Sequence, residues 1–362
     1  MNKQIKQLGI DVDRSTFLWN LIDICNYKCS YCNAPHGTNY NDFKKFNYNK
    51  RSVWKQVVNR LSVRSIGMFN LEILGGEPTL HPELHNICTK LCVGDNCKRM
   101  DIYTNLSKSV DYFKEYQHLN VVRFIAAYHP QYYNDKFIEK IKQLNMNRPG
   151  FIIPSINMSP DPIHWDQMER LINTCIDENI DFRINFLHSI QSGMEGDIPD
   201  VDTKKNPGFK NTITYTDQFW YRFEDMVNNN WKSLTNTNYT KPSKSMREYV
   251  SEDMVNVRNM FIPGYELPIT YVDGDKSTIT EGNLVEKNLN RFKGYNCKTR
   301  LYYIDLDGQI VNYCTGESLP IYINEQELSK CRICPRDVCD RRAFIYEDKT
   351  KYYRELVDEK HT

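Results

Sequence analysis

The sequence of 362 residues contains no run of eighteen apolar residues and no apolar core near its N-terminus. A membrane-spanning helix needs about 20 consecutive apolar residues, and a secretory signal needs an apolar core of about 7–15. The chain also has no excess charge of one sign, because its formal net charge is +1. We therefore expect a cytoplasmic protein that binds neither a membrane nor nucleic acid.

Internal repeats and low-complexity tracts are also lacking, whereas cysteine is plentiful, with twelve residues. Without an export signal, this number favours metal-binding or catalytic thiols over a disulfide framework. The apolar fraction of 40% is ordinary for a globular protein, and the length allows one large domain and a smaller one.

Six short segments rich in β-branched residues are typical of strands, and most are followed by a helix-like pattern. These strands are predicted at residues 17–24, 69–74, 100–103, 121–127, 151–156 and 182–187. Apolar residues recur with helical spacing at 53–61 and 168–176. Alternating strands and helices predict an α/β fold with a parallel sheet, a partial (β/α)6 TIM-like barrel. Ligands of such sheets collect at the carboxyl ends of the strands.

The composition divides the chain into five parts. The pattern predicts an N-terminal extension at 1–13, the barrel at 14–190, an irregular bridging insertion at 191–290, a cysteine-rich domain at 291–345 and a C-terminal tail at 346–362. The insertion is polar and rich in Gly, Pro and Asn, and we expect one or two helices in it, at 217–232 and 243–260.

Three cysteines, Cys25, Cys29 and Cys32, follow the first predicted strand with Cys-x3-Cys-x2-Cys spacing. A four-iron cluster is normally held by four thiolates, so three thiolates leave one iron open to a small molecule. Two alternatives remain on this loop alone. His36 offers a fourth ligand for a zinc knuckle, and the cysteines are also compatible with unrelated reduced thiols.

Polar or glycine-rich segments follow the other strands. The second strand ends in Gly75-Gly76-Glu77-Pro78, where glycine allows close backbone approach, and the third ends in Thr104-Asn105. Further polar residues follow the fourth to sixth strands, and we assign none of them as a general acid or base: Tyr128, His129, Asn157, His188 and Ser189.

The cysteine spacing, with Tyr31 before Cys32, and the Gly75-Gly76-Glu77-Pro78 stretch together resemble the radical S-adenosylmethionine (radical SAM) superfamily. The resemblance implies a [4Fe–4S] cluster on the three cysteines, with S-adenosylmethionine on the open iron. It implies that Gly75, Gly76, Glu77 and Pro78 bind the amino group of that cofactor and that Asn105 lies against its ribose. It also implies an electron donor such as flavodoxin or ferredoxin.

A second group of cysteines lies near the C-terminus: Cys297, Cys314, Cys331, Cys334 and Cys339. Between the first two, the sequence predicts a β-hairpin that turns at Asp307-Gly308. Four thiolates hold either a zinc ion or an iron–sulfur cluster. The remaining cysteines Cys88, Cys92 and Cys175 fit apolar helix positions, and Cys97 is predicted to be a free thiol in a polar turn.

This region resembles the SPASM and shorter twitch domains of radical SAM enzymes, although five cysteines are fewer than the seven of a full SPASM domain. The resemblance implies one auxiliary [4Fe–4S] cluster on Cys297, Cys314, Cys331 and Cys334, with Cys339 as a substitute ligand. A structural zinc is the alternative.

The resemblance implies reductive cleavage of S-adenosylmethionine to a 5′-deoxyadenosyl radical, which removes hydrogen from a substrate. We favour a small polar substrate, such as a sugar, because no extra peptide-recognition domain precedes the barrel. Modification of a ribosomal peptide is the alternative within this class. A zinc-binding regulator without catalytic activity is the alternative from another class.

Overall fold

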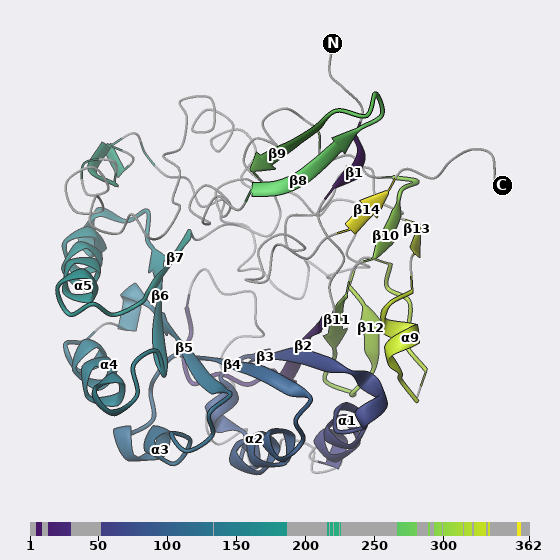
Figure 1. Cartoon of the computed structure of the whole chain (residues 1–362). Helices are drawn as coiled ribbons and strands as arrows, with labels where there is room; N and C mark the ends of the chain where they lie inside the picture. The colour runs from purple at the N-terminus through teal and green to yellow at the C-terminus, as the bar shows by residue number, and fades with distance from the viewer. Residues whose placement is uncertain are drawn as a thin grey trace, which may run out of the picture.

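A curved eight-stranded sheet forms the larger part of the structure, a computed structural model (Figure 1). It describes residues 5–8, 14–29, 52–132, 134–186, 216, 218–219, 221–223, 225, 266–280, 289, 293–298, 300–313, 315–320, 322–330, 332–333 and 353–355. The order of strands in this sheet is β12-β11-β2-β3-β4-β5-β6-β7.

Six neighbouring strands of this sheet, β2 to β7, run parallel. They span β2 Arg14–Ile22, β3 Met68–Gly75, β4 Cys97–Thr104, β5 Val122–Tyr128, β6 Ile152–Met158 and β7 Arg183–Phe186. The six predicted strands and the partial α/β barrel are confirmed.

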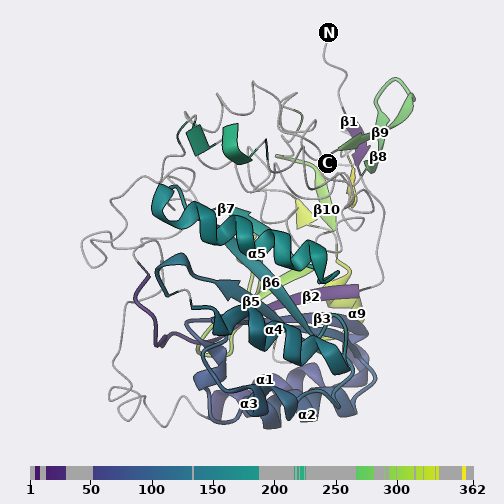
Figure 2. The same ribbon diagram turned by 90° about the vertical axis from the view of Figure 1, so that its left-hand side faces the viewer.

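Helices cover the outer face of the curved sheet (Figures 1 and 2). They are α1 Val53–Leu61, α2 Leu84–Val93, α3 Val110–Lys114, α4 Lys136–Asn147 and α5 Trp165–Asp177. The helical spacing at 53–61 and 168–176 is thereby confirmed. None of the helices in the described ranges has both the length and the apolar composition to cross a membrane.

The two faces of the sheet differ in polarity because successive residues of a strand point to opposite sides. In β3, Phe69, Leu71 and Ile73 join the apolar core under the helices. The intervening Asn70 and Glu72 are buried as well, at 2% and 1% exposure. The inner, concave face therefore carries polar side chains that are shielded from solvent.

The predicted C-terminal hairpin is present and extends the barrel sheet. β11 Leu301–Ile304 pairs with β12 Ile310–Asn312 across a turn that contains Gly308 at φ 77°. β11 also runs parallel to β2, and the ring of Tyr302 stacks on that of Phe17 at 5.4 Å. Arg60 of α1 donates to the carbonyl oxygens of Gly308 and Pro320 at 3.1 and 2.8 Å. The hairpin is thus built into the first βα unit. The short helix α9 Glu325–Leu328 follows it.

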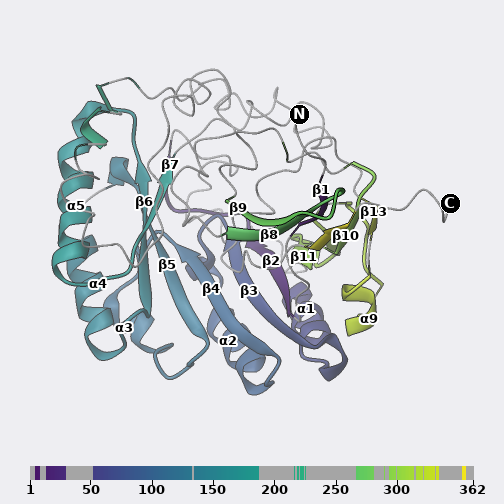
Figure 3. The ribbon, with the colours of Figure 1, turned by 45° about the horizontal axis from the view of Figure 1, so that its top comes forward.

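A second sheet, in the order β13-β10-β14-β1-β8-β9, is antiparallel and lies at the β11 end of the main sheet (Figure 3). Its strands are β1 Ile5–Leu8, β8 Glu266–Tyr271, β9 Lys276–Thr280, β10 Asn296–Lys298, β13 Arg332–Ile333 and β14 Tyr353–Glu355. The N-terminal extension and the C-terminal tail therefore each contribute one strand.

The sequence pattern predicts no strand in 191–290, yet β8 and β9 form a hairpin there around Asp273-Gly274. The turn signal is present, and Leu267, Ile269 and Tyr271 alternate in β8. However, Pro268 interrupts that strand, and β9 is polar apart from Ile279. Residues 218–219, 221–223 and 225 are helical, within the expected helix at 217–232. The helix expected at 243–260 lies outside the described residues.

Candidate metal and cofactor site

The predicted cysteine loop starts directly at the carboxyl end of β2 and is hydrogen-bonded to the end of β3. The backbone N–H of Gly76 donates to Ile22 O at 2.7 Å, and that of Glu77 donates to Ile24 O at 2.8 Å. A side chain at Gly75 would collide with Ile22 O, and one at Gly76 would collide with Ile24 O. Glycine is required because the two backbones touch, and Gly75 also has φ 139°.

Glu77 lies beneath this contact and is 1% exposed. Its carboxylate accepts hydrogen bonds from Thr79 N at 3.1 Å, Thr79 Oγ1 at 2.5 Å, Thr104 Oγ1 at 2.7 Å and Asn105 N at 2.6 Å. Burial raises the pKa of Glu77, and these four hydrogen bonds act against that rise by stabilising the ionised form. The carboxylate therefore joins the end of β3 to the end of β4.

Asn105 connects the end of β4 to the cysteine loop. Its Nδ2 donates to Asn26 Oδ1 at 2.8 Å and lies 3.9 Å from Cys25 Sγ, while its Oδ1 accepts from Ser107 N at 3.0 Å. The next residue, Leu106, has the left-handed φ of 56°. Lys140 Nζ donates to Leu106 O at 3.0 Å and holds this turn.

Cys29 meets His129, the residue that follows β5. Cys29 is 3% exposed, and its Sγ lies 3.3 Å from His129 Nδ1. The rings of Tyr27 and Tyr132 stack at 4.1 Å, and Tyr27 meets the imidazole edge-on at 5.6 Å. Burial lowers the pKa of His129 to about 4 and raises that of Tyr27 to about 12, so both groups are neutral at pH 7.

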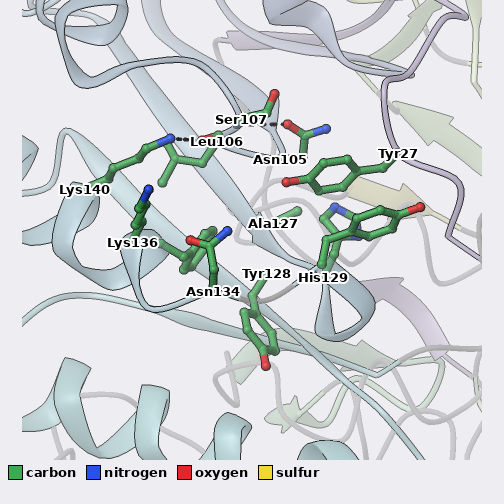
Figure 4. A pocket seen from close by; sticks show the side chains of 12 residues that line it. Tyr27, Asn105, Leu106, Ser107, Ala127, Tyr128, His129, Asn134, Lys136 and Lys140 are labelled. Carbon is green, nitrogen blue, oxygen red and sulfur yellow. Dashed lines mark hydrogen bonds between the residues drawn. The ribbon is translucent and has the colours of Figure 1, made fainter. Parts of the chain in front are cut away.

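A cavity of about 150 Å³ lies beside these residues, between the strand ends and the start of α4 (Figure 4). Tyr27, Asn105 and His129 line it together with Asn134 and Lys136. The cysteine loop and the ends of β4 and β5 thus meet at one place. Tyr132 also lines the cavity and was not predicted as a site residue. Its only sequence signal is that it is an aromatic residue shortly after a strand end.

Most of the predicted site residues on the barrel come together here. Cys25, Cys29, the Gly75–Pro78 stretch and Asn105 all lie at the carboxyl ends of β2, β3 and β4. Asn157 is buried near the end of β6. The predicted residues Tyr31, Cys32, Cys314, Cys331, Cys334 and Cys339, together with His36, His188 and Ser189, lie outside the described residues.

The donor set fits an iron–sulfur ligand loop. Cys25 and Cys29 both lie close to the Tyr27 phenol, and hydrogen-bond donors face both sulfurs. Within the described residues, no three His, Cys, Asp or Glu side chains are grouped closely enough to hold a metal ion, and the third predicted thiol, Cys32, lies outside them.

The concave face near the site carries a network of buried carboxylates and partly buried arginines. Asp101 is 0% exposed and accepts two hydrogen bonds from Arg123, one of them at 2.9 Å. Arg99 and Arg183 approach the same carboxylate at 3.4 and 3.7 Å. Tyr103 donates to Glu72 Oε2 at 3.2 Å, which continues the network across the sheet.

The other barrel cysteines are core residues. Cys88 and Cys175 are 0% exposed and Cys92 packs against the core, as predicted. The prediction for Cys97 is wrong in one respect, because this residue begins β4 and is 4% exposed instead of lying in a polar turn. Burial raises the pKa of Cys175 to about 12 and that of Cys92 to about 11.

Fold and site together define a protein with a partial α/β barrel and a cysteine loop at the carboxyl ends of its strands. Residues 19–181 match the family model described as the Radical SAM superfamily, and this part of the chain is a radical SAM domain. No curated protein matches the chain.

Solved structures similar to this chain include Streptococcus suis SuiB bound to S-adenosylmethionine, with a TM-score of 0.48, 13% identity, and coverage of 85% of this chain and 63% of that one. Coproporphyrinogen III oxidase (HemN) from Escherichia coli has a TM-score of 0.40, 12% identity, and coverage of 66% and 58%. The structure of anSMEcpe with bound AdoMet and Cp18Cys peptide has a TM-score of 0.41, 12% identity, and coverage of 93% and 81%. The assignment of residues 19–181 to the superfamily rests on the family match.

Proposed function

We propose that this protein is a radical SAM enzyme in which Cys25, Cys29 and Cys32 hold a [4Fe–4S] cluster with one open iron. The observation that carries the proposal is the hydrogen-bonded junction between the cysteine loop and the Gly75–Glu77 stretch. With both groups bound, the cluster and S-adenosylmethionine supply reductive cleavage to a 5′-deoxyadenosyl radical. The electron comes from a donor such as flavodoxin or ferredoxin.

In this proposal, the ends of the strands bind and orient S-adenosylmethionine. Gly75, Gly76 and Pro78 offer backbone groups to its amino group, and Tyr31 and Asn105 contact its nucleoside part. Glu77 supports this site indirectly, because its carboxylate already accepts four hydrogen bonds from residues at the ends of β3 and β4. The buried Glu77 carboxylate thereby holds the end of β3 against the end of β4.

The substrate that we propose is small and polar, for instance a sugar. The support is the concave face of the barrel, where Arg123 is paired with Asp101 and Tyr103 donates a hydrogen bond to Glu72. An apolar substrate would shield these polar and charged groups from water without giving them hydrogen-bond partners, which is costly.

We further propose an auxiliary cluster on Cys297, Cys314, Cys331 and Cys334, with Cys339 as a substitute ligand. The backbone of Cys297 lies in β10, where it pairs with Arg332 of β13. Because Cys331 and Cys334 flank β13 in the sequence, this pairing supports a shared site. The cluster would bind the substrate or accept the electron released on its oxidation.

Anaerobic reconstitution with iron and sulfide tests the proposal. We expect two [4Fe–4S] clusters per chain by iron and sulfide analysis, and 5′-deoxyadenosine after addition of dithionite and S-adenosylmethionine. Zinc in place of iron, together with no 5′-deoxyadenosine, would overturn the proposal and favour a regulatory zinc protein. Deuterium transfer from labelled sugars or peptides into 5′-deoxyadenosine then identifies the substrate class.

A further inference from the structure

We propose that His129 is a positioning residue for the cysteine loop, whose Nδ1–H donates a hydrogen bond to Cys29 Sγ and thereby sets the reduction potential of the cluster on that sulfur. This inference rests on the proposed function and deepens it. The Sγ–Nδ1 distance is 3.3 Å, and the two residues are 100 positions apart in the sequence.

The direction of this hydrogen bond follows from chemistry. A cysteine that ligates iron is a thiolate, which accepts hydrogen bonds and has no proton to donate. His129 Nδ1 must then carry the proton, which fixes the tautomer of the ring.

The surroundings of His129 hold the ring in place. Pro130 follows it and starts a 3-10 turn at Pro130–Tyr132, in which Tyr132 N donates to His129 O at 2.9 Å. On the other side, Tyr27 meets the imidazole edge-on, and Tyr132 stacks on Tyr27. The orientation toward Cys29 is therefore determined by the packing of the loop (Figure 4 shows Tyr27 and His129 beside one another at the cavity).

Hydrogen-bond donors face both described sulfurs of the loop, and a side-chain amide, Asn105 Nδ2, lies 3.9 Å from Cys25 Sγ. Cys25 Sγ accepts from the backbone N–H of Tyr27 at 3.4 Å, which a substitution of that side chain leaves in place. Cys29 Sγ faces a side-chain donor, which a substitution removes. Hydrogen bonds to cluster sulfurs stabilise the reduced, more negative state and so raise the reduction potential.

The test compares reconstituted wild-type protein with three variants by redox titration monitored by electron paramagnetic resonance. H129F removes the N–H and keeps a ring, H129N places an amide N–H near the position of Nδ1, and H118F changes an exposed histidine elsewhere. We expect the one-electron reduction equilibrium of the cluster to fall about tenfold in H129F, a shift of about 59 mV to lower potential. H129N should recover most of the shift, and H118F should match wild type.

When the variants hold the cluster, either of two results would overturn the inference: equal potentials in H129F and wild type, or equal shifts in H129F and H129N, since the latter indicates packing alone. If H129F takes up no cluster, the test rests on H129N. A wild-type potential in H129N would support the role of His129 as a donor, and failure of H129N to hold iron would contradict that role. A failure of the proposed function is distinct, since wild-type protein would then bind zinc and form no 5′-deoxyadenosine.

Discussion

The cysteines at the strand ends and those under the helices show how the surroundings decide what one residue type does. Cys25 and Cys29 face hydrogen-bond donors from Tyr27 and His129. Cys88, by contrast, lies in the apolar core, where burial raises its pKa well above the ordinary value. A core thiol stays protonated and inert, whereas a thiol among donors is suited to ionise and bind metal.

The largest expected effect comes from removing one thiol of each kind. Cys29→Ala should abolish both the cluster of this loop and 5′-deoxyadenosine formation, because two thiolates remain where three are needed. Cys175→Ala is the matched control in the core, and it should keep iron content and activity. Iron analysis and chromatography of 5′-deoxyadenosine measure both. Full activity of Cys29→Ala would contradict the assigned role.

A buried and an exposed carboxylate can be compared in the same way as the two kinds of thiol. Asp101→Ala should lower the free energy of unfolding by about 3 kcal/mol, because it leaves three partly buried arginines without their shared, fully buried carboxylate. Asp111→Ala, which removes the partner of Lys114 in an exposed pair at 3.4 Å, should cost less than about 1 kcal/mol. Urea unfolding of the two variants measures the difference. Similar losses in both would show that Asp101 is not a structural centre.

Glu77 tests the junction itself. Glu77→Ala should lower the free energy of unfolding by about 3 kcal/mol, because it leaves buried donors of Thr79, Thr104 and Asn105 without their acceptor. It should also reduce the iron content, since the cysteine loop is fixed to this strand end. Glu83→Ala removes an exposed contact with Asn86 and serves as the control. Unchanged iron content in Glu77→Ala would separate the junction from the loop.

The smallest effect is one of reactivity, measured on native apoprotein with iodoacetamide at pH 8. Of Cys25, Cys88 and Cys175, the partly exposed Cys25 should be alkylated first, whereas the two core thiols should react only after unfolding. The pKa of Cys175 rises to about 12, so little thiolate is present at pH 8. Peptide mass spectrometry gives the order. Alkylation of Cys175 together with Cys25 would indicate that the core opens locally.

The strands of the barrel could be predicted because their apolar, β-branched runs are local signals. The meeting of Cys25 with Gly76 and Asn105 was also predictable, since the carboxyl ends of parallel strands share one edge. The reason that position 76 requires glycine could not be predicted. The sequence suggested that a ligand approaches this backbone, whereas in the structure the carbonyl group of Ile24 does.

Contacts between segments that are distant in the chain could not be predicted from the sequence. The contact between Cys29 and His129 depends on the register of β5 and on the turn at Pro130, which no local pattern specifies. The pairing of β1 with β14 and β8 involves short or polar strands whose partners are far away in the chain. Cys97 was predicted to lie in a polar turn because its sequence neighbours are polar, although it occupies a buried position in β4.

The parallel pairing of β11 with β2 has a consequence for synthesis of the chain. The ribosome releases β2 early and β11 late, so the outer edge of β2 has no strand from the hairpin beside it while most of the protein is being made. An open strand edge is a template for wrong pairing and aggregation. We therefore expect nascent or truncated chains that end before Leu301 to depend on chaperones, and the hairpin to act as the step that completes the barrel sheet.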